Sequence, residues 1–153
     1  MFHIVLVEPE IPQNTGNIAR TCAATGSMLH LVGKLGFSIE QKEVRRAGLD
    51  YWDKVFVDQY PDLDGLLARY PNARLWLATT KAKQFHTAAK FSDGDFLVFG
   101  KETKGLDQSI LERYPQQMIR LPMRKDLRSL NLANSVAAIL YEALRQTGFP
   151  GLV

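Results

Sequence analysis

Three clusters of polar side chains contain the residues of this sequence that are best suited to chemistry. They cover residues 12–20, 101–105 and 123–131, and each follows a strand expected from a short apolar run. Amide, hydroxyl, carboxylate and guanidinium groups together can bind a charged ligand and orient a hydroxyl group for reaction. Because ligands of parallel α/β proteins bind beyond the carboxyl ends of the strands, the clusters predict a ligand site there.

Each cluster also has an ordinary structural interpretation. Asn14 or Thr15 could cap a helix, and Ser129 or Asn131 could cap the last helix of the chain. The charged residues could simply be solvated, as most surface charges are. No single cluster decides between the two interpretations.

Short strands that alternate with helices are expected to position these clusters. Apolar runs predict strands at residues 3–7, 28–33, 54–58, 75–80, 96–100 and 118–122. Helices are expected from Asn14 or Thr15 to Gly26, over 41–47, from Pro61 to Tyr70, over 107–114 and from Leu130 to Thr147. This alternation predicts an α/β domain with a largely parallel sheet.

The final helix carries apolar residues over most of its circumference. Asn131, Ser135, Glu142 and Arg145 leave only a narrow polar side. A helix on the surface of a monomer needs an apolar stripe only about 100° wide. We therefore expect this helix to be buried on two sides, either in its own core or against a second subunit.

Composition excludes several classes of protein. The chain has 153 residues, of which 46% are hydrophobic and 23% charged, as in an ordinary globular domain. No apolar run approaches the roughly 20 residues that cross a bilayer, and the N-terminal sequence lacks the basic segment of a signal peptide. The single cysteine, Cys22, cannot form an internal disulfide, so we expect a reducing cytoplasm as the location.

The net charge of +3 is unevenly distributed along the chain. Residues 1–76 hold 8 basic and 9 acidic side chains, whereas residues 77–153 hold 11 and 7. This is a mild bias toward polyanionic partners, and an ordinary basic enzyme would show the same bias.

Familiar nucleotide, metal and hydrolase motifs are missing from the sequence. Residues 100–105 superficially resemble a phosphate-binding loop, but Leu106 and Asp107 stand where lysine and serine or threonine are required. Neither G-x-G-x-x-G nor G-x-S-x-G occurs. The three histidines share no metal-ligand spacing with each other or with the cysteine, so no metal is expected.

The combination of the three clusters resembles the motifs of SPOUT RNA methyltransferases. These motifs are N-x-G-N-x-x-R at 14–20, F-G-x-E-x-x-G-L at 99–106 and R-S-x-N-L-x-N at 128–134. More narrowly, EPEIPxNTGNIxR, RRAGLDY, LATTK and the ending GFPG are similar to the YibK-like tRNA 2′-O-methyltransferases. The resemblance extends from about residue 3 to residue 151.

The resemblance implies a single SPOUT domain over residues 1–153, in which a largely parallel sheet is flanked by helices. It also implies a deep C-terminal trefoil knot, which is an exception to the usual absence of knots. An obligate homodimer is expected, with S-adenosyl-L-methionine as methyl donor. The implied substrate is the ribose 2′-hydroxyl of the wobble nucleotide, position 34, in the anticodon stem-loop of tRNA.

Five residues are implied to surround the reacting groups. Arg20 is the best candidate for the catalytic centre, where it would grip the phosphate beside the target ribose and polarise the 2′-hydroxyl. Whether Arg20 also accepts the proton, and whether it serves the other subunit's site, is left open. Asn14 would orient Arg20 or the ribose. Glu102, Ser129 and Asn131 would complete the hydrogen-bond network around the donor and the acceptor.

The donor is implied to lie among three loops and the start of the last helix. Backbone groups at Ala78, Gly100 and Leu121 would read its adenine and ribose, and Gly100 would allow a close backbone approach. The full set expected to bind the donor is Ala78, Thr79, Gly100, Glu102, Gly105, Leu121, Met123, Ser129, Leu130 and Ala133.

RNA contacts are expected from cations and one aromatic residue: Arg20, Arg45, Arg46, Tyr51, Arg124, Lys125 and Arg128. Tyr51, with its neighbour Trp52, could instead pack a loop onto the core. Lys101 stands where this family often has proline, which could alter RNA affinity. Two other functions remain open, namely 2′-O-methylation of another RNA such as rRNA, and a non-catalytic RNA-binding dimer.

Overall fold

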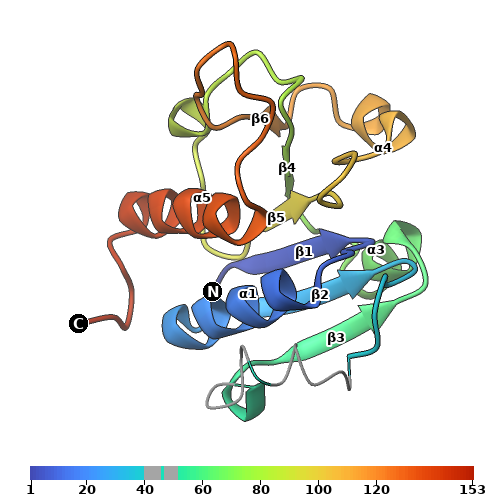
Figure 1. Ribbon diagram of the computed structural model, residues 1–153. Helices are drawn as coiled ribbons and strands as arrows, with labels where there is room; N and C mark the ends of the chain where they lie inside the picture. Colours follow the sequence, from blue (N-terminus) through green and yellow to red (C-terminus); the bar gives the residue numbers. More distant parts are fainter. Residues whose placement is uncertain (40–45, 47–51) are drawn as a thin grey trace.

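The computed structural model describes residues 1–39, 46 and 52–153, and its centre is a six-stranded sheet (Figure 1). The strand order is β3-β2-β1-β5-β4-β6, and every neighbouring pair is parallel. The strands are β1 (His3–Val7), β2 (Met28–Val32), β3 (Val57–Tyr60), β4 (Leu75–Ala78), β5 (Phe96–Phe99) and β6 (Met118–Ile119). The predicted α/β class with a parallel sheet is confirmed.

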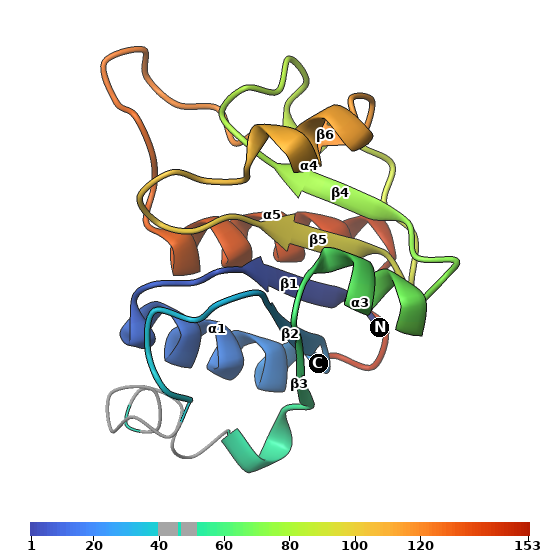
Figure 2. The ribbon, with the colours of Figure 1, turned by 90° about the vertical axis from the view of Figure 1, so that its right-hand side faces the viewer.

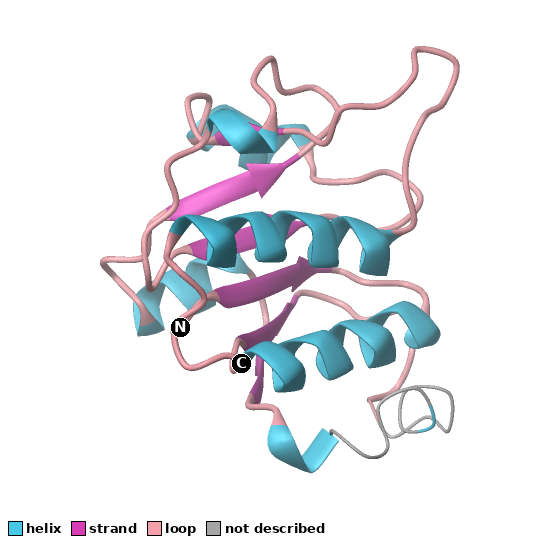
Figure 3. Cartoon of the chain, turned by 90° about the vertical axis from the view of Figure 1, so that its left-hand side faces the viewer, coloured by secondary structure: helices cyan, strands magenta, loops and turns pink. Residues whose placement is uncertain are grey.

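Helices cover both faces of the sheet. Helices α1 (Pro12–Thr25) and α5 (Leu132–Gln146) lie side by side on one face, as Figure 3 shows. The opposite face carries α3 (Leu63–Arg69) and α4 (Gln108–Arg113), which lie in front of the sheet in Figure 2. Two short 3₁₀ helices, η1 (Trp52–Lys54) and η2 (His86–Ala88), lie in connecting segments.

The side chains of the central strands alternate between two buried cores. In β1, Ile4 and Leu6 pack with α1 and α5, whereas Val5 and Val7 pack with α3 and α4. A strand that is covered on both faces reads as a continuous apolar run rather than as an alternating one. This is why uninterrupted runs located the strands in the sequence.

Helix α1 begins earlier than expected. Ile11 is its N-cap residue and makes no side-chain capping bond, while Asn14 and Thr15 are buried within the helix. The expectation that Asn14 or Thr15 caps this helix is therefore wrong. Pro12 occupies the first turn, where its fixed φ suits a helix and its missing N–H costs nothing. The expected end at Gly26 is confirmed, because Gly26 has a left-handed φ of 69°.

Several other boundaries also differ from the expected ones. The third strand begins at Val57 rather than at position 54, because residues 52–54 form η1. Helix α3 is capped by Asp62, whose carboxylate accepts a hydrogen bond from the Gly65 backbone N–H at 2.7 Å. The helix expected over 41–47 lies outside the described residues, except for Arg46.

Asn131 is the residue that caps α5. Its side-chain oxygen accepts a hydrogen bond from the Asn134 backbone N–H at 3.2 Å, so the capping interpretation holds for Asn131 and not for Ser129. Asp107 is the N-cap residue of α4 without a side-chain capping bond. Within the part of the chain that the structure describes, no helix is long and apolar enough to span a membrane.

Candidate active site at the carboxyl edge of the sheet

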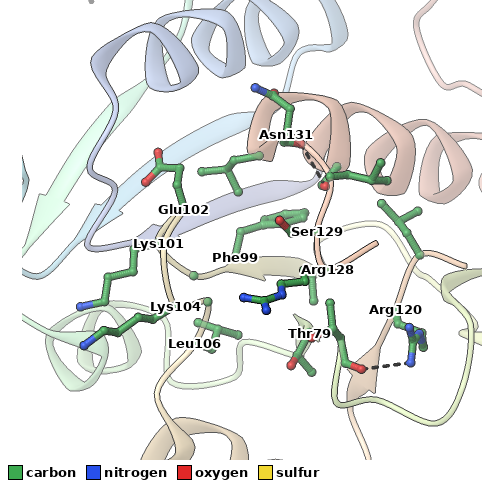
Figure 4. Close-up of a pocket in the computed structure, with 18 of the residues that line it drawn as sticks. Thr79, Phe99, Lys101, Glu102, Lys104, Leu106, Arg120, Arg128, Ser129 and Asn131 are labelled. Atoms are coloured by element: carbon green, nitrogen blue, oxygen red, sulfur yellow. Dashed lines mark hydrogen bonds between the residues drawn. The ribbon is translucent and has the colours of Figure 1, made fainter. Parts of the chain in front are cut away.

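A cavity of about 510 Å³ opens beyond the carboxyl ends of β4, β5 and β6 (Figure 4). Its walls are the segments that follow these strands, together with the start of α5 and the residues that begin α1. Binding cavities for small molecules commonly have about 300–1,000 Å³. All three polar clusters of the sequence contribute to this one cavity.

Nine of the ten residues expected to bind the donor line the cavity. They are Ala78, Thr79, Gly100, Glu102, Gly105, Leu121, Met123, Ser129 and Leu130. The tenth, Ala133, is not among the lining residues and packs against the core beneath α1 and α5. The first turn of α5 directs Ala133 toward the core, and its contact with the donor stays a prediction.

The loop that follows β5 folds tightly upon itself. Gly105 has a φ of 68°, and its backbone N–H donates to the Lys101 carbonyl at 2.8 Å. A Cβ atom on Gly100 would collide with the backbone of Gly105 and Leu106. Gly100 is thus required by the packing of its own loop, a reason that differs from the expected close approach of a ligand.

Glu102 ties this loop to the start of α1. Its carboxylate accepts hydrogen bonds from the backbone N–H groups of Glu10 at 2.8 Å and Ile11 at 3.2 Å. The side-chain amide of Asn14 donates to the same carboxylate at 3.5 Å. Glu102 is therefore not simply hydrated in a charged loop. It stabilises N–H groups at a helix N-terminus, where negative charge is favoured.

A second contact joins the same two segments from the other side. Thr103 donates from its backbone N–H at 3.1 Å and from its hydroxyl at 2.8 Å to the carboxylate of Glu10. These hydrogen bonds, together with the nearby Lys101 and Lys104, lower the pKa of the Glu10 carboxyl. Each of the two segments thus supplies a carboxylate that accepts hydrogen bonds from the other segment.

Asn14 extends the network to the last helix. The side-chain amide of Asn131 donates to the Asn14 side-chain oxygen at 3.1 Å, while the Asn131 oxygen caps α5. One chain of hydrogen bonds therefore joins Glu102, Asn14 and Asn131, which belong to three different sequence clusters. Buried and half-buried networks of this kind hold their members in one arrangement.

Arg20 is not among the described residues that line the cavity, and its side chain is exposed on α1. Asn14 and Arg20 are six residues apart, which places them about 120° from each other around a helix. The same helix therefore directs Asn14 toward the cavity and Arg20 toward the outer surface. The structure does not bring Arg20 into the site of its own chain.

Cations line the cavity more densely than the sequence suggested. Arg128 was expected to contact RNA, and it points into the centre of the cavity in Figure 4. Four further cations also line it, namely Lys81, Lys101, Lys104 and Arg120. The sequence did not predict Lys81 or Arg120 as cavity residues. Lys81 ends the LATTK motif and Arg120 lies in an expected strand, and neither segment indicated a role for its charged side chain.

Among the residues that the structure describes, none of the other expected RNA contacts lines the cavity. Arg124 and Lys125 are exposed in the loop after β6, and Arg124 pairs with Asp126 at 3.4 Å. Arg46 is exposed, whereas Arg45 and Tyr51 lie outside the described residues. Across residues 1–39, 46 and 52–153, no group of three His, Cys, Asp or Glu side chains is placed to hold a metal ion.

The parallel sheet and the cavity at its carboxyl edge define a class of α/β ligand-binding proteins. Within this class, the chain belongs to the SpoU rRNA Methylase family, whose profile matches residues 1–141. This membership confirms the resemblance to SPOUT methyltransferases that the three motifs indicated.

Individual relatives are similar over the whole chain. The tRNA (cytidine(34)-2′-O)-methyltransferase of Escherichia coli strain K12 is 49% identical over 154 residues, covering 100% of this chain and 98% of the relative. A structure reported under "Structural insights into the 2-OH methylation of C/U34 on tRNA" is 41% identical, covers 97% of both chains and has a TM-score of 0.92.

A more distant structure shares the fold. The SpoU methyltransferase AviRb from Streptomyces viridochromogenes, solved in complex with the cofactor AdoMet, has a TM-score of 0.85 at 24% identity. The match covers 95% of this chain and 57% of that protein.

Proposed function

We propose that the protein transfers a methyl group from S-adenosyl-L-methionine to the ribose 2′-hydroxyl of nucleotide 34 of tRNA. The observation that carries this proposal is the single cavity in which Asn14, Glu102, Ser129 and Asn131 meet. Similarity over the full length to methyltransferases acting on position 34 supports the choice of substrate. Such a substrate is consistent with the expected cytoplasmic location.

The cavity suits the proposed donor in size and in chemistry. Leu121, Met123 and Leu130 offer apolar contact to an adenine ring and a methionine chain, while the loops at Ala78 and Gly100 offer backbone groups for its polar edges. When bound, the cofactor supplies an electrophilic methyl group attached to a sulfonium.

The task of this chain is to hold the donor loops and the acceptor hydroxyl in a fixed relation. In-line transfer requires the reacting atoms to be held about 3–3.5 Å apart, and this positioning is a large part of the catalytic benefit. The hydrogen bonds among Glu102, Asn14 and Asn131 fix the loop after β5 against the starts of α1 and α5. We assign these three residues a positioning role.

Arg20 is assigned to the site of a second subunit. It projects from the outer surface of α1, which lies beside α5 on the face shown in Figure 3. Asn17 and Ala24 on α1 and Ala138 on α5 are also exposed on these helices, and small side chains allow close helix contact. Pairing two copies through this face accounts for the wide apolar stripe of α5 and lets Arg20 grip an RNA phosphate at the partner's cavity. The trefoil knot stays a prediction.

The substrate and the reaction are tested together by methyl transfer into total RNA from a labelled donor, followed by alkaline hydrolysis. A 2′-O-methyl group blocks cleavage at the adjacent phosphate, so we expect the label in alkali-resistant dinucleotides from the tRNA fraction. Label in mononucleotides would exclude the ribose as acceptor. Label in rRNA would support the alternative that the family description suggests.

The shared site is tested by mixing two inactive variants. Arg20→Ala should retain donor binding and lose turnover, and Ser129→Ala supplies a chain with a defective cavity. If Arg20 serves the partner's cavity, a mixed dimer contains one complete site and activity returns on mixing. If each site is built from one chain alone, mixing restores nothing, and our assignment of Arg20 to the partner's site is wrong.

A further inference from the structure

The segment after β4, residues 81–86, presents an aromatic ring and two cations to solvent. The side chain of Phe85 is 50% exposed, and Lys81 and Lys83 are exposed at alternating positions before it. Ala82 between them is buried and anchors the segment. A single exposed phenylalanine is ordinary on a protein surface, so its setting decides whether it carries information.

The backbone on both sides of Phe85 is fixed to the chain after β6. The Arg120 N–H donates to the Gln84 carbonyl at 3.1 Å, and the His86 N–H donates to the Arg120 carbonyl at 2.8 Å. The Gln84 side chain adds a bond to the Met118 carbonyl at 3.1 Å. The ring therefore projects from a rigid extension of the sheet rather than from a loose loop.

This rigid extension places Phe85 beside the cavity. Phe85 and Arg120 are partners in a parallel bridge, and bridge partners project to the same face. Arg120 lines the cavity, and its guanidinium donates to the Thr80 carbonyl at 3.0 Å, as Figure 4 shows. Phe85 is not itself among the residues that line the cavity, but it lies directly beside Arg120, which is one of them.

The charge of this surface favours RNA as the partner. Lys81 and Arg120 line one side of the cavity, and Lys101, Lys104 and Arg128 line the rest. The proposed donor carries a sulfonium and does not itself need so many cations. A polyanion such as RNA does need many cations. An exposed aromatic ring next to cations is also the arrangement that binds unpaired nucleotides.

We propose that Phe85 is a stacking platform for an unpaired nucleobase next to the methylated nucleotide, with Lys81 and Lys83 contacting the flanking phosphates. This inference rests on the proposed function and adds a residue that selects for single-stranded RNA. Stacking on a side chain is tolerant of base identity, because every base has a π-face. The platform therefore contributes to RNA affinity rather than to choice of base.

Three substitutions at one position test the platform. Phe85→Ala should raise the KM for tRNA about tenfold or more, with kcat and donor affinity unchanged, because a stacked base is lost. Phe85→Tyr keeps a ring and should behave like the unmodified protein. Phe85→Leu keeps apolar volume without a ring and should resemble Phe85→Ala. Phe149→Ala, which removes an exposed phenylalanine near the C-terminus, is the matched control and should change nothing.

The salt dependence of binding to an anticodon stem-loop RNA separates stacking from charge. Lys83→Ala should reduce the slope of log affinity against log salt by about one, whereas Phe85→Ala should leave the slope unchanged. An unchanged KM for Phe85→Ala, or a Leu variant as good as Tyr, would overturn the inference. A change in the molecular mass of Phe85→Ala by light scattering would make Phe85 a subunit contact and overturn it too.

The experiments distinguish failure of the proposed function from failure of the Phe85 platform. If the unmodified protein transfers no methyl group to tRNA, the proposed function fails whatever the variants do. Filter binding of the stem-loop RNA then still compares Phe85→Ala with Phe149→Ala. If tRNA is methylated normally by every Phe85 variant, only the platform fails.

Discussion

At the scale of single residues, Glu102 shows how a carboxylate can serve a reaction by holding other groups in place. Both of its oxygens accept hydrogen bonds. Two of these bonds come from the backbone N–H groups of Glu10 and Ile11, directly before α1. A carboxylate oriented in this way is better suited to fixing the loop after β5 than to taking a proton from substrate. Hydrogen bonds to charged groups are also the stronger ones in proteins.

Glu102→Gln should lower the free energy of unfolding by about 1–3 kcal/mol and weaken donor binding. The amide NH₂ of glutamine would face an N–H group that now donates to an oxygen, so at least one bond is lost. Chemical denaturation and a donor-binding titration measure the two effects. Glu112→Gln, at an exposed position on α4, should change neither quantity. Equal behaviour of the two variants would show that the network is dispensable.

Gly100→Ala should disrupt the donor loop while the sheet stays folded. The added methyl group collides with the backbone of Gly105, and overpacking of this kind costs about 1–3 kcal/mol. If the loop moves to relieve the collision, donor affinity should fall about tenfold or more, which calorimetry measures. Gly94→Ala is the control. Its backbone φ of 91° is strained for alanine, but an added Cβ atom would meet open space, so this variant shows the effect of backbone strain without a collision. Normal donor affinity in Gly100→Ala would contradict the prediction.

At the scale of elements, strands β1 and β2 hold a pair of histidines, of which His30 is buried and His3 half-buried. His3 Nδ1 lies 2.9 Å from His30 Nε2, and the His3 ring stacks on Phe96 with the ring centroids 4.0 Å apart. Burial lowers the pKa of each histidine to about 4, and the N-terminal amino group contributes at His3. Both rings are therefore neutral in the folded protein near neutral pH, and one nitrogen of the pair donates to the other.

The histidine pair should make the fold sensitive to acid. In the unfolded chain both histidines take up protons near pH 6.5, but in the folded chain only near pH 4. The unfolded state therefore binds more protons between these values, and stability falls as the pH drops through this window. Urea unfolding at pH 7, 6 and 5 measures the slope. His3→Phe, which keeps the stack on Phe96, should reduce the slope, and an unchanged slope would exclude the pair as its source.

At the scale of the whole molecule, the face formed by α1 and α5 is the one that the proposed dimer would use. Helices α1 and α5 pack against each other and against the sheet, yet Asn17, Arg20 and Ala24 on α1 and Ala138 and Tyr141 on α5 stay exposed. Arg20 lies on this face and away from its own cavity. A site completed across the proposed dimer would explain how a chain of 153 residues can both hold the proposed donor and grip RNA.

Ala138→Glu should separate the proposed dimer. A carboxylate placed at the centre of a close helix contact would be buried and unpaired, which costs several kcal/mol. Sedimentation should then show a monomer, and methyl transfer should be lost while the chain stays folded. Ala68→Glu makes the same change at an exposed alanine of α3, on the opposite face of the sheet, and should preserve mass and activity. A dimeric Ala138→Glu protein would place the interface elsewhere.

The sequence by itself determined the class of fold and the segments that form the cavity. Strands with both faces covered are continuous apolar runs, and parallel strands end at a common edge, so the polar residues after them had to converge. Local pattern also fixed the end of α1 at Gly26. Local pattern misplaced the start of α1. Asn14 and Thr15 are typical capping residues, but the helix begins at Pro12.

Only the tertiary structure decided how the functional groups face one another. Glu102 meets the N–H groups of Glu10 and Ile11 across about ninety residues of chain, and Asn131 meets Asn14 across 117. It likewise directed Arg20 away from its own cavity and brought Phe85 beside Arg120. Residue type and spacing predict what a short segment can form. Contacts between distant segments depend on the relative orientation of packed elements, which no local pattern contains.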